Sequence, residues 1–222
     1  MNKFVMRRMR HGFNLVEAAI VLGVIGLVIG GIWVAASAAT EAHRVNETAK
    51  GMMSMCERIG NVFPSWGAPA GYSSNITAAA GQAGVVPGDW QYNGSSYVTP
   101  LGAPMHNVSY WGTTSGLQGH IGIVLGGDNA GWRPTTPAVG LNQSQCRRFI
   151  ANIAGGRRSG VQSRMKYFIL YHSDSASSLS FNTMYYLDSP NNLSPRADTV
   201  NGVDAVCGEY NEIELVCTNT NN

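Results

Sequence analysis

The chain has few charged residues and lacks the sequence motifs of the common enzyme classes. Asp, Glu, Lys and Arg make up 13 % of its 222 residues, about half the usual share in globular proteins. No nucleophile elbow, zinc-protease helix, Walker loop or dinucleotide-binding glycine pattern occurs in it. We therefore expect a protein that is not an enzyme, with no catalytic residue, no metal and no cofactor. Its 27 glycines suit a loop-rich extracellular domain better than a cytosolic enzyme.

Only one stretch of the chain is apolar enough and long enough to cross a membrane. It runs from Phe13 to Ala39, and Glu17 is its single charged residue. At about 1.5 Å rise per residue, a helix of this length spans the ~30 Å hydrocarbon core of a bilayer. No acidic residue occurs upstream, where four basic residues cluster: Lys3, Arg7, Arg8 and Arg10. This asymmetry predicts a single-pass chain with its N-terminus in the cytoplasm.

An ordinary secretory signal peptide would also have a basic start and an apolar stretch. Here the apolar stretch is longer than the usual ~7–15 residues. It also contains Glu17, and an acidic side chain at the centre of a bilayer costs about 2.5–3.5 kcal/mol. An ionisable residue in a membrane-spanning segment is a functional hypothesis by default. We therefore interpret Glu17 as a functional residue.

The sequence HGFNLVE at 11–17 resembles the class III signal of type IV prepilins and type II secretion pseudopilins. In that signal a basic leader ends in glycine, as at Gly12, and glutamate is the fifth residue after the cut, as at Glu17. The resemblance implies that prepilin peptidase cuts between Gly12 and Phe13 and that Phe13 is N-methylated. Asn14 stands where many relatives have threonine. In a filament, the α-amine of Phe13 and the Glu17 carboxylate of a neighbouring subunit would neutralise each other in a low-dielectric environment.

The helix is expected to continue beyond the membrane as an amphipathic helix docked on a domain. Its apolar residues recur at steps of four and three, which places them on one helical stripe: Ala38, Ala42, Val45, Ala49, Met52, Cys56, Ile59 and Phe63. Pro64 follows this stripe and ends the helix. The sequence thus predicts a leader at 1–12, one helix at 13–63 with its transmembrane part at 13–39, and a globular head at 64–222.

The head is predicted to be of α+β class, an antiparallel sheet packed on the long helix. Apolar or alternating runs predict strands at 119–126, 165–173, 183–188 and 211–218. Helical spacing predicts helices at 76–83 and 143–154, the second capped by Asn142. The stretch 64–118 is rich in Gly, Pro, Ser and Asn, and we expect a long irregular connection with short elements there, the first of these helices among them.

Three segments, 84–111, 141–153 and 206–217, resemble type IVb pilins of the toxin-coregulated and conjugative-plasmid kinds. The resemblance implies a pilin fold and a structural subunit that polymerises with copies of itself for adhesion, aggregation or conjugation. It implies as partners prepilin peptidase, the inner-membrane assembly machinery, the membrane itself before assembly, and a host or recipient-cell surface. The protein would begin as an inner-membrane precursor and end in an extracellular pilus. The twelve-residue leader is short for this subgroup.

Two other functions fit the same sequence features. The chain could prime or tip a filament as a minor pilin or a secretion pseudopilin, which the same processing signal allows. It could also be a membrane-anchored binding protein that never polymerises. The abundance of the chain in purified filaments distinguishes a minor pilin or pseudopilin from a major subunit. Cleavage of the chain and its incorporation into a fibre would exclude a binding protein that never polymerises.

The four cysteines, Cys56, Cys146, Cys207 and Cys217, lie outside the cytoplasm in this topology, where disulfides form. No CxxC pair indicates a zinc site. The resemblance favours the pair Cys146–Cys207, which leaves Cys56–Cys217. The patterns support the second pair, because Cys56 lies on the docked helical stripe and Cys217 alternates in phase with Ile213 and Leu215. Cys207–Cys217 with Cys56–Cys146 remains the alternative.

Charge in the head is divided into two blocks along the sequence. Residues 129–173 contain seven basic and no acidic residues, and residues 174–222 contain seven acidic residues and one basic residue. The blocks could pair within the fold as solvated faces or meet between neighbouring subunits. A DNA contact through the basic block is a third reading. The block carries no nucleic-acid motif and no interleaved aromatic platform, so we expect no nucleic-acid partner.

Overall fold

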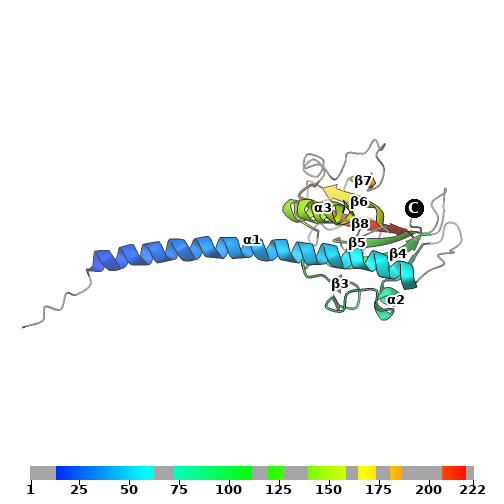
Figure 1. The fold of residues 1–222 in the computed structure, drawn as a ribbon, viewed down its shortest axis with the longest axis horizontal. Coiled ribbons are helices and arrows are strands. Elements are labelled where there is room, and N and C mark those ends of the chain that lie inside the picture. Colours follow the sequence, from blue (N-terminus) through cyan, green and yellow to red (C-terminus); the bar gives the residue numbers. More distant parts are fainter. Residues whose placement is uncertain are drawn as a thin grey trace, which may run out of the picture. The chain divides into compact units, whose positions relative to one another are not determined.

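The computed structural model of the chain describes residues 14–62, 73–111, 120–127, 140–158, 165–173, 181–186 and 207–218. Contacts divide the chain into two compact units, Met1–Glu41 and Ala42–Asn222. Helices and strands follow in the order drawn in Figure 1: α1 (Leu15–Val62), β1 (Ser73–Asn75), α2 (Thr77–Gln82), β2 (Gln91–Tyr92), β3 (Tyr97–Val98), β4 (Pro104–Trp111), β5 (His120–Leu125), α3 (Gln143–Arg158), β6 (Met165–Ser173), β7 (Phe181–Tyr186) and β8 (Tyr210–Thr218).

Helix α1 is continuous for 48 residues. It begins after Asn14, whose side-chain Oδ1 accepts a hydrogen bond from the Val16 N–H at 3.3 Å, as an N-cap residue does. Its second half buries one face: Val45, Thr48, Ala49, Met52, Met53, Met55, Cys56, Ile59 and Gly60. The predicted stripe is therefore confirmed from Val45 to Ile59. It starts later than expected, because Ala38 is exposed.

The sheet is antiparallel throughout, in the order β2-β3-β4-β5-β8-β6-β7, with β1 paired to β4. The strand β8 lies between β5 and β6, so the last described strand of the chain is central in the sheet. On one face of the sheet, Ile121, Ile123 and Leu125 of β5 lie opposite Cys217, Leu215 and Ile213 of β8, and all six are fully buried. This face therefore belongs to the core.

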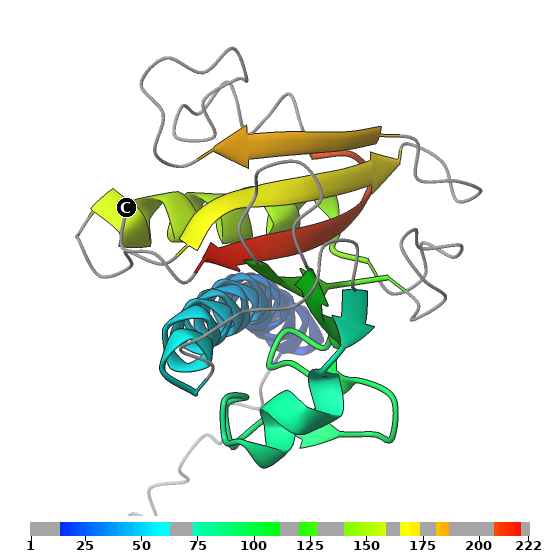
Figure 2. The ribbon, with the colours of Figure 1, turned by 90° about the vertical axis from the view of Figure 1, so that its right-hand side faces the viewer.

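Both helices of the core pack on this face of the sheet. The buried residues of α1 and α3 form one hydrophobic cluster with those of the sheet, and Phe149 and Phe168 are the largest fully buried side chains. Figure 2 shows α3 running along β6 and β8. The chain from Ala42 onward thus has the α+β layout that the sequence predicts, with helices on one side of an antiparallel sheet.

The predicted strands at 119–126, 165–173 and 211–218 are confirmed as β5, β6 and β8, and the helix at 76–83 as α2. The strand predicted at 183–188 is β7, which begins two residues earlier, at Phe181. The helix predicted at 143–154 is α3, which extends to Arg158. Each was recognised from periodicity, which locates an element better than its ends.

The prediction of an irregular connection with short elements at 64–118 is wrong for β4, which is a strand of eight residues. The segment contains β4, which pairs with β1, β3 and β5, and the short hairpin β2–β3. The alternation of β4 is broken by a register shift between Met105 and Asn107, which gives a β-bulge. The bulge and the polar residues His106 and Asn107 hide the period-two pattern by which strands are recognised.

The segment between α2 and β2 docks on α1 through Gly51. Trp90 is 5 % exposed, and a Cβ added to Gly51 would lie 2.5 Å from its Cζ2 atom and 3.3 Å from Cγ of Pro87. Near it, the N–H of Leu101 donates to Oγ1 of the buried Thr48 at 3.1 Å. A glycine in the middle of a helix costs about 1 kcal/mol relative to alanine. Here it makes room for the indole ring.

We expect the substitution Gly51→Ala to destabilise the head by about 1–3 kcal/mol, because the new methyl group displaces the buried Trp90 ring. Helix propensity alone predicts that the same change stabilises the head by about 1 kcal/mol. The sign of the change in unfolding free energy therefore distinguishes the two effects. Urea unfolding measures it. The double variant Gly51→Ala/Trp90→Leu should lose much less than the sum of the two single changes, and a more stable single Gly51→Ala variant would contradict the packing.

Candidate functional site: the N-terminal helix and the disulfides of the head

The first half of α1 presents an apolar surface that the rest of the described chain does not cover. Its large side chains are exposed: Leu15, Val16, Ile20, Val21, Leu22, Val24, Ile25, Leu27, Val28, Ile29, Ile32, Trp33 and Val34. The helix is long and apolar enough to cross a membrane, and it is the one such helix among the described residues. An apolar surface of this extent in water requires a lipid or protein partner.

Glu17 is the acidic residue of this apolar segment and lies in the first turn of α1. Its side chain is exposed, and no described residue forms an ion pair with it. A carboxylate near a helix N-terminus is favoured by the helix dipole, but only by about 0.3–1 kcal/mol. That is too little to offset removal from water, so Glu17 needs a cationic partner in an apolar environment. The predicted cleavage site, Gly12 and Phe13, lies outside the described residues.

The two hydroxyl residues at the end of the apolar segment are satisfied within the helix itself. Oγ of Ser37 donates to the carbonyl oxygen of Val34 at 2.9 Å, and Oγ1 of Thr40 donates to that of Ala36 at 2.8 Å. Such back-bonding leaves no hydroxyl proton that requires water. The helix can therefore carry both residues at or near an apolar boundary.

Two disulfides connect the helices of the head to the segment 207–217, one of them in the strand β8 and the other just before it. Cys56 of α1 is bonded to Cys217 of β8, with Cα atoms 5.4 Å apart, and Cys146 of α3 is bonded to Cys207, with Cα atoms 6.0 Å apart. Both are the pairs expected from the sequence, and the alternative pairing does not form. The first joins residues 161 positions apart and the second joins residues 61 apart. The helix that carries the apolar segment is thus covalently attached to the centre of the sheet.

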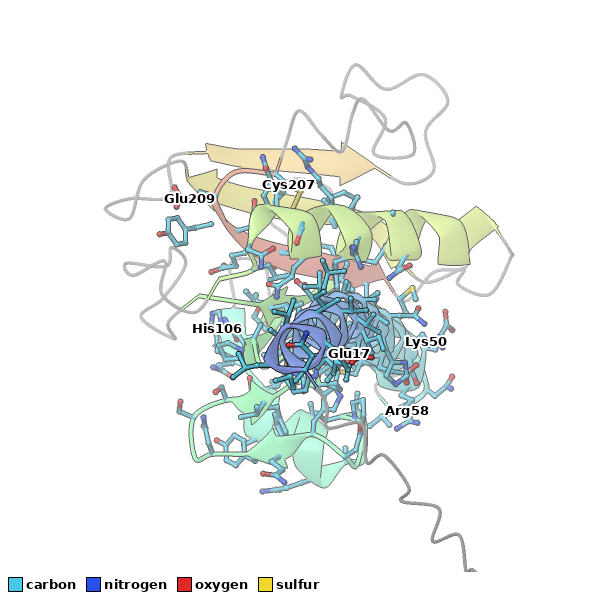
Figure 3. The ribbon with its side chains drawn as sticks, turned by 90° about the vertical axis from the view of Figure 1, so that its left-hand side faces the viewer. Glu17, Lys50, Arg58, His106, Cys207 and Glu209 are labelled. Carbon is cyan, nitrogen blue, oxygen red and sulfur yellow. A yellow bond between two sulfur atoms is a disulfide. The ribbon has the colours of Figure 1, made fainter. Side chains whose placement is uncertain are left out.

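Asn211 holds the chain on both sides of the Cys146–Cys207 disulfide, and its role was not foreseen from the sequence. Its Nδ2 donates to the carbonyl oxygens of Leu141 and Gly208 at 3.0 and 2.9 Å, and its Oδ1 accepts from the Gly208 N–H at 2.9 Å. Gln143 adds a bond from Nε2 to the Cys207 carbonyl oxygen at 2.8 Å. Cys207 lies beside α3 (Figure 3). Because Leu141 lies 70 residues before Asn211 in the sequence, no local pattern identifies the bond that joins these two segments.

Two residues of the acidic block predicted for the head are buried in the structure. Glu212 and Glu214 are each only 4 % exposed, because they lie on the central strand β8, on the face opposite the core. The Glu214 side chain lies over Gly122, and that of Glu212 lies over Gly127 near His106. Two of the seven expected acids therefore form no surface patch. Of the others, Glu209 is exposed, and the rest lie outside the described residues.

Two residues of the basic block lie side by side in the sequence on α3, where Arg148 is exposed and Arg147 is half-buried. On α1, Lys50 and Arg58 extend from the exposed side of the helix (Figure 3). Lys50 forms an ion pair with Glu47 at 3.1 Å. Among the described residues, no three His, Cys, Asp or Glu side chains are grouped so that they could hold a metal ion.

Comparison of the chain with protein-family models, with curated proteins and with solved structures finds no match. The assignment of a function therefore depends on the helix, the single carboxylate of its apolar first half and the disulfide-bonded head.

Proposed function

We propose that the chain is a structural subunit of a type IV pilus, of the type IVb kind, with a pilin fold. One observation carries the proposal. A single unbroken helix, Leu15–Val62, has an exposed apolar first half and a second half that is buried in the head and disulfide-bonded to it. A membrane anchor alone needs no such helical continuation, whereas a filament subunit needs one element that belongs to both the fibre and the head.

The two environments of such a subunit explain the apolar surface. In the membrane, lipid covers the exposed side chains of the first half of α1. In the filament, the same side chains pack against the corresponding helices of neighbouring subunits. Both environments are apolar, so the helix can pass from one to the other without large exposure to water. The inner membrane is the place of the precursor and the extracellular pilus that of the product.

The position of Glu17 supplies the chemistry of assembly. Cleavage between Gly12 and Phe13 creates an α-amine four residues before the carboxylate. Within one helix these two groups belong to the same turn, but a growing filament presents the carboxylate of the subunit added before. An amine and a carboxylate brought together in an apolar fibre core attract strongly, while either one alone is disfavoured. The pair therefore sets the register in which each new subunit joins.

We expect the mature protein to begin at Phe13 with an N-methylated α-amine, and mass spectrometry of its N-terminal peptide tests this. Filaments sheared from the cell surface should contain the processed chain as their main component. The variant Gly12→Val should leave an uncut precursor in the membrane and no filaments. A mature chain that begins near Ala39 would instead identify an ordinary secretory signal. A processed chain that is scarce in the filaments would identify a minor pilin or a pseudopilin.

A further inference from the structure

We propose that Trp33 is a lipid-interface anchor, which binds the headgroup region at the outer side of the membrane and sets the depth of α1 before assembly. This inference rests on the proposed function in one respect, that the precursor is held in a membrane. The partner it names is a lipid surface.

Trp33 differs from the other residues of the apolar segment in both chemistry and place. It is the single aromatic residue between Leu15 and Thr40, and its side chain is 76 % exposed. An indole has a large apolar body and one N–H donor, and tryptophan is enriched where hydrocarbon meets headgroups. On its N-terminal side the chain is almost entirely aliphatic, and on its C-terminal side it changes to Ala, Ser and Thr. Trp33 thus marks the end of the strongly apolar part.

The spacing between Trp33 and Glu17 matches the thickness of a bilayer. They are 16 residues apart in one continuous helix, which corresponds to about 24 Å at ~1.5 Å per residue. The hydrocarbon core is about 30 Å thick. A helix centred in the membrane therefore places each of the two within about 3 Å of opposite interfaces, with Glu17 at the cytoplasmic side.

Only a narrow range of depths of α1 in the membrane keeps both Glu17 and Trp33 near an interface. A shift of two helical turns, about 11 Å, would bring either the carboxylate or the indole N–H close to the membrane centre. Near the interface the cost of the Glu17 carboxylate falls, because it can reach headgroups and water. Trp33 and Glu17 therefore act together as depth markers at the two interfaces.

With Glu17 and Trp33 at the two interfaces, the membrane-embedded part of the helix is shorter than the sequence alone predicts. The sequence alone predicts a transmembrane part at 13–39, which would be about 40 Å long as a helix. With Trp33 at the outer interface, the hydrocarbon ends near Val34. Residues 35–41 then lie at the outer headgroup layer, where the internally bonded hydroxyls of Ser37 and Thr40 are compatible with either water or lipid.

Depth-dependent fluorescence quenching tests the proposal. The full chain is reconstituted in vesicles of phosphatidylcholine and phosphatidylglycerol whose acyl chains carry bromine either near the ester or near the terminal methyl group. The difference between the parent protein and Trp33→Phe isolates the signal of Trp33 from those of the other four tryptophans. We expect bromine near the ester to quench this signal more strongly, by a factor of about two or more, since contact quenching falls off within a few ångströms and the two bromine depths differ by roughly half of a ~30 Å core.

A matched control places a tryptophan at the expected centre of the membrane. In the Trp33→Phe background, the substitution Ile25→Trp should be quenched more strongly by bromine near the terminal methyl group. Strongest quenching of Trp33 by the deep bromine would overturn the register, and absence of quenching by either lipid would show that protein or water surrounds this residue. The measurement needs neither cleavage nor polymerisation. If filaments form but Trp33 is not interfacial, only the anchor fails; if Trp33 is interfacial and no filaments form, the pilus function fails.

Discussion

The variant Glu17→Ala is expected to remain in the membrane and to form no filaments. Removing a carboxylate from an apolar segment makes insertion easier, so the precursor should still fractionate with membranes and be cut after Gly12. Assembly should fail, because the α-amine of Phe13 would enter the apolar fibre core without a partner. Breaking a buried ion pair by removing one member costs about 3–5 kcal/mol, which corresponds to more than about a hundredfold in an association constant.

Glu47→Ala provides the matched control, since Glu47 is another acidic residue of the same helix. It forms an ion pair with Lys50 at 3.1 Å, and both side chains are substantially exposed. Surface pairs of this kind contribute little, about 0.3–0.5 kcal/mol within a helix, so filament yield should stay close to that of the parent. Electron microscopy and quantitative immunoblotting of sheared surface protein compare the variants. Normal numbers of filaments from Glu17→Ala would refute the role of the carboxylate.

The double variant Cys56→Ala/Cys217→Ala is expected to lose about 2–5 kcal/mol of stability in the head. The lost bond closes a loop between residues 161 positions apart, and a longer closed loop restricts the unfolded chain more strongly. Both cysteines belong to the buried hydrophobic core, so their replacement by alanine also loosens packing. Urea unfolding of the full chain in detergent micelles, followed by tryptophan fluorescence, measures the loss.

Removal of the other disulfide gives a second stability loss with which the first can be compared. The variant Cys146→Ala/Cys207→Ala opens a loop between residues 61 positions apart. The entropic difference between the two loops is about 0.9 kcal/mol at 25 °C. The pair Cys56–Cys217 should therefore be the more important of the two. Equal stability of the parent with and without reductant would show that neither bond stabilises the fold.

The long helix and the strongly periodic strands could be predicted from the sequence because their patterns are local. The stripe from Val45 to Ile59 repeats over four turns, and β8 alternates through Ile213, Leu215 and Cys217. Strand β4 could not be recognised, because the bulge after Met105 changes the phase of its alternation. The hairpin strands β2 and β3 have only two residues each, which is too short for any periodicity.

The features of the candidate site likewise divide into those that have a local sequence pattern and those that do not. Cys56 and Cys217 could be matched because each lies on a periodic face, whereas the pair Cys146–Cys207 needed a family resemblance. The sequence predicts that Glu212 and Glu214 are surface acids, because a charged residue on a strand usually faces water. The sequence does not reveal that β8 is flanked on both sides by other strands and that both acids are buried there.

The central place of β8 in the sheet has a consequence for the order of folding. Strands β5 and β6 do not pair with each other; each pairs with β8. Until β8 has been synthesised, the sheet therefore exists as two separate parts with unpaired edges, which are prone to non-native association. Closing it requires contacts distant in sequence, which slows folding. The head thus becomes native only after β8 is available to pair with both parts, and the incomplete chain needs protection during that interval.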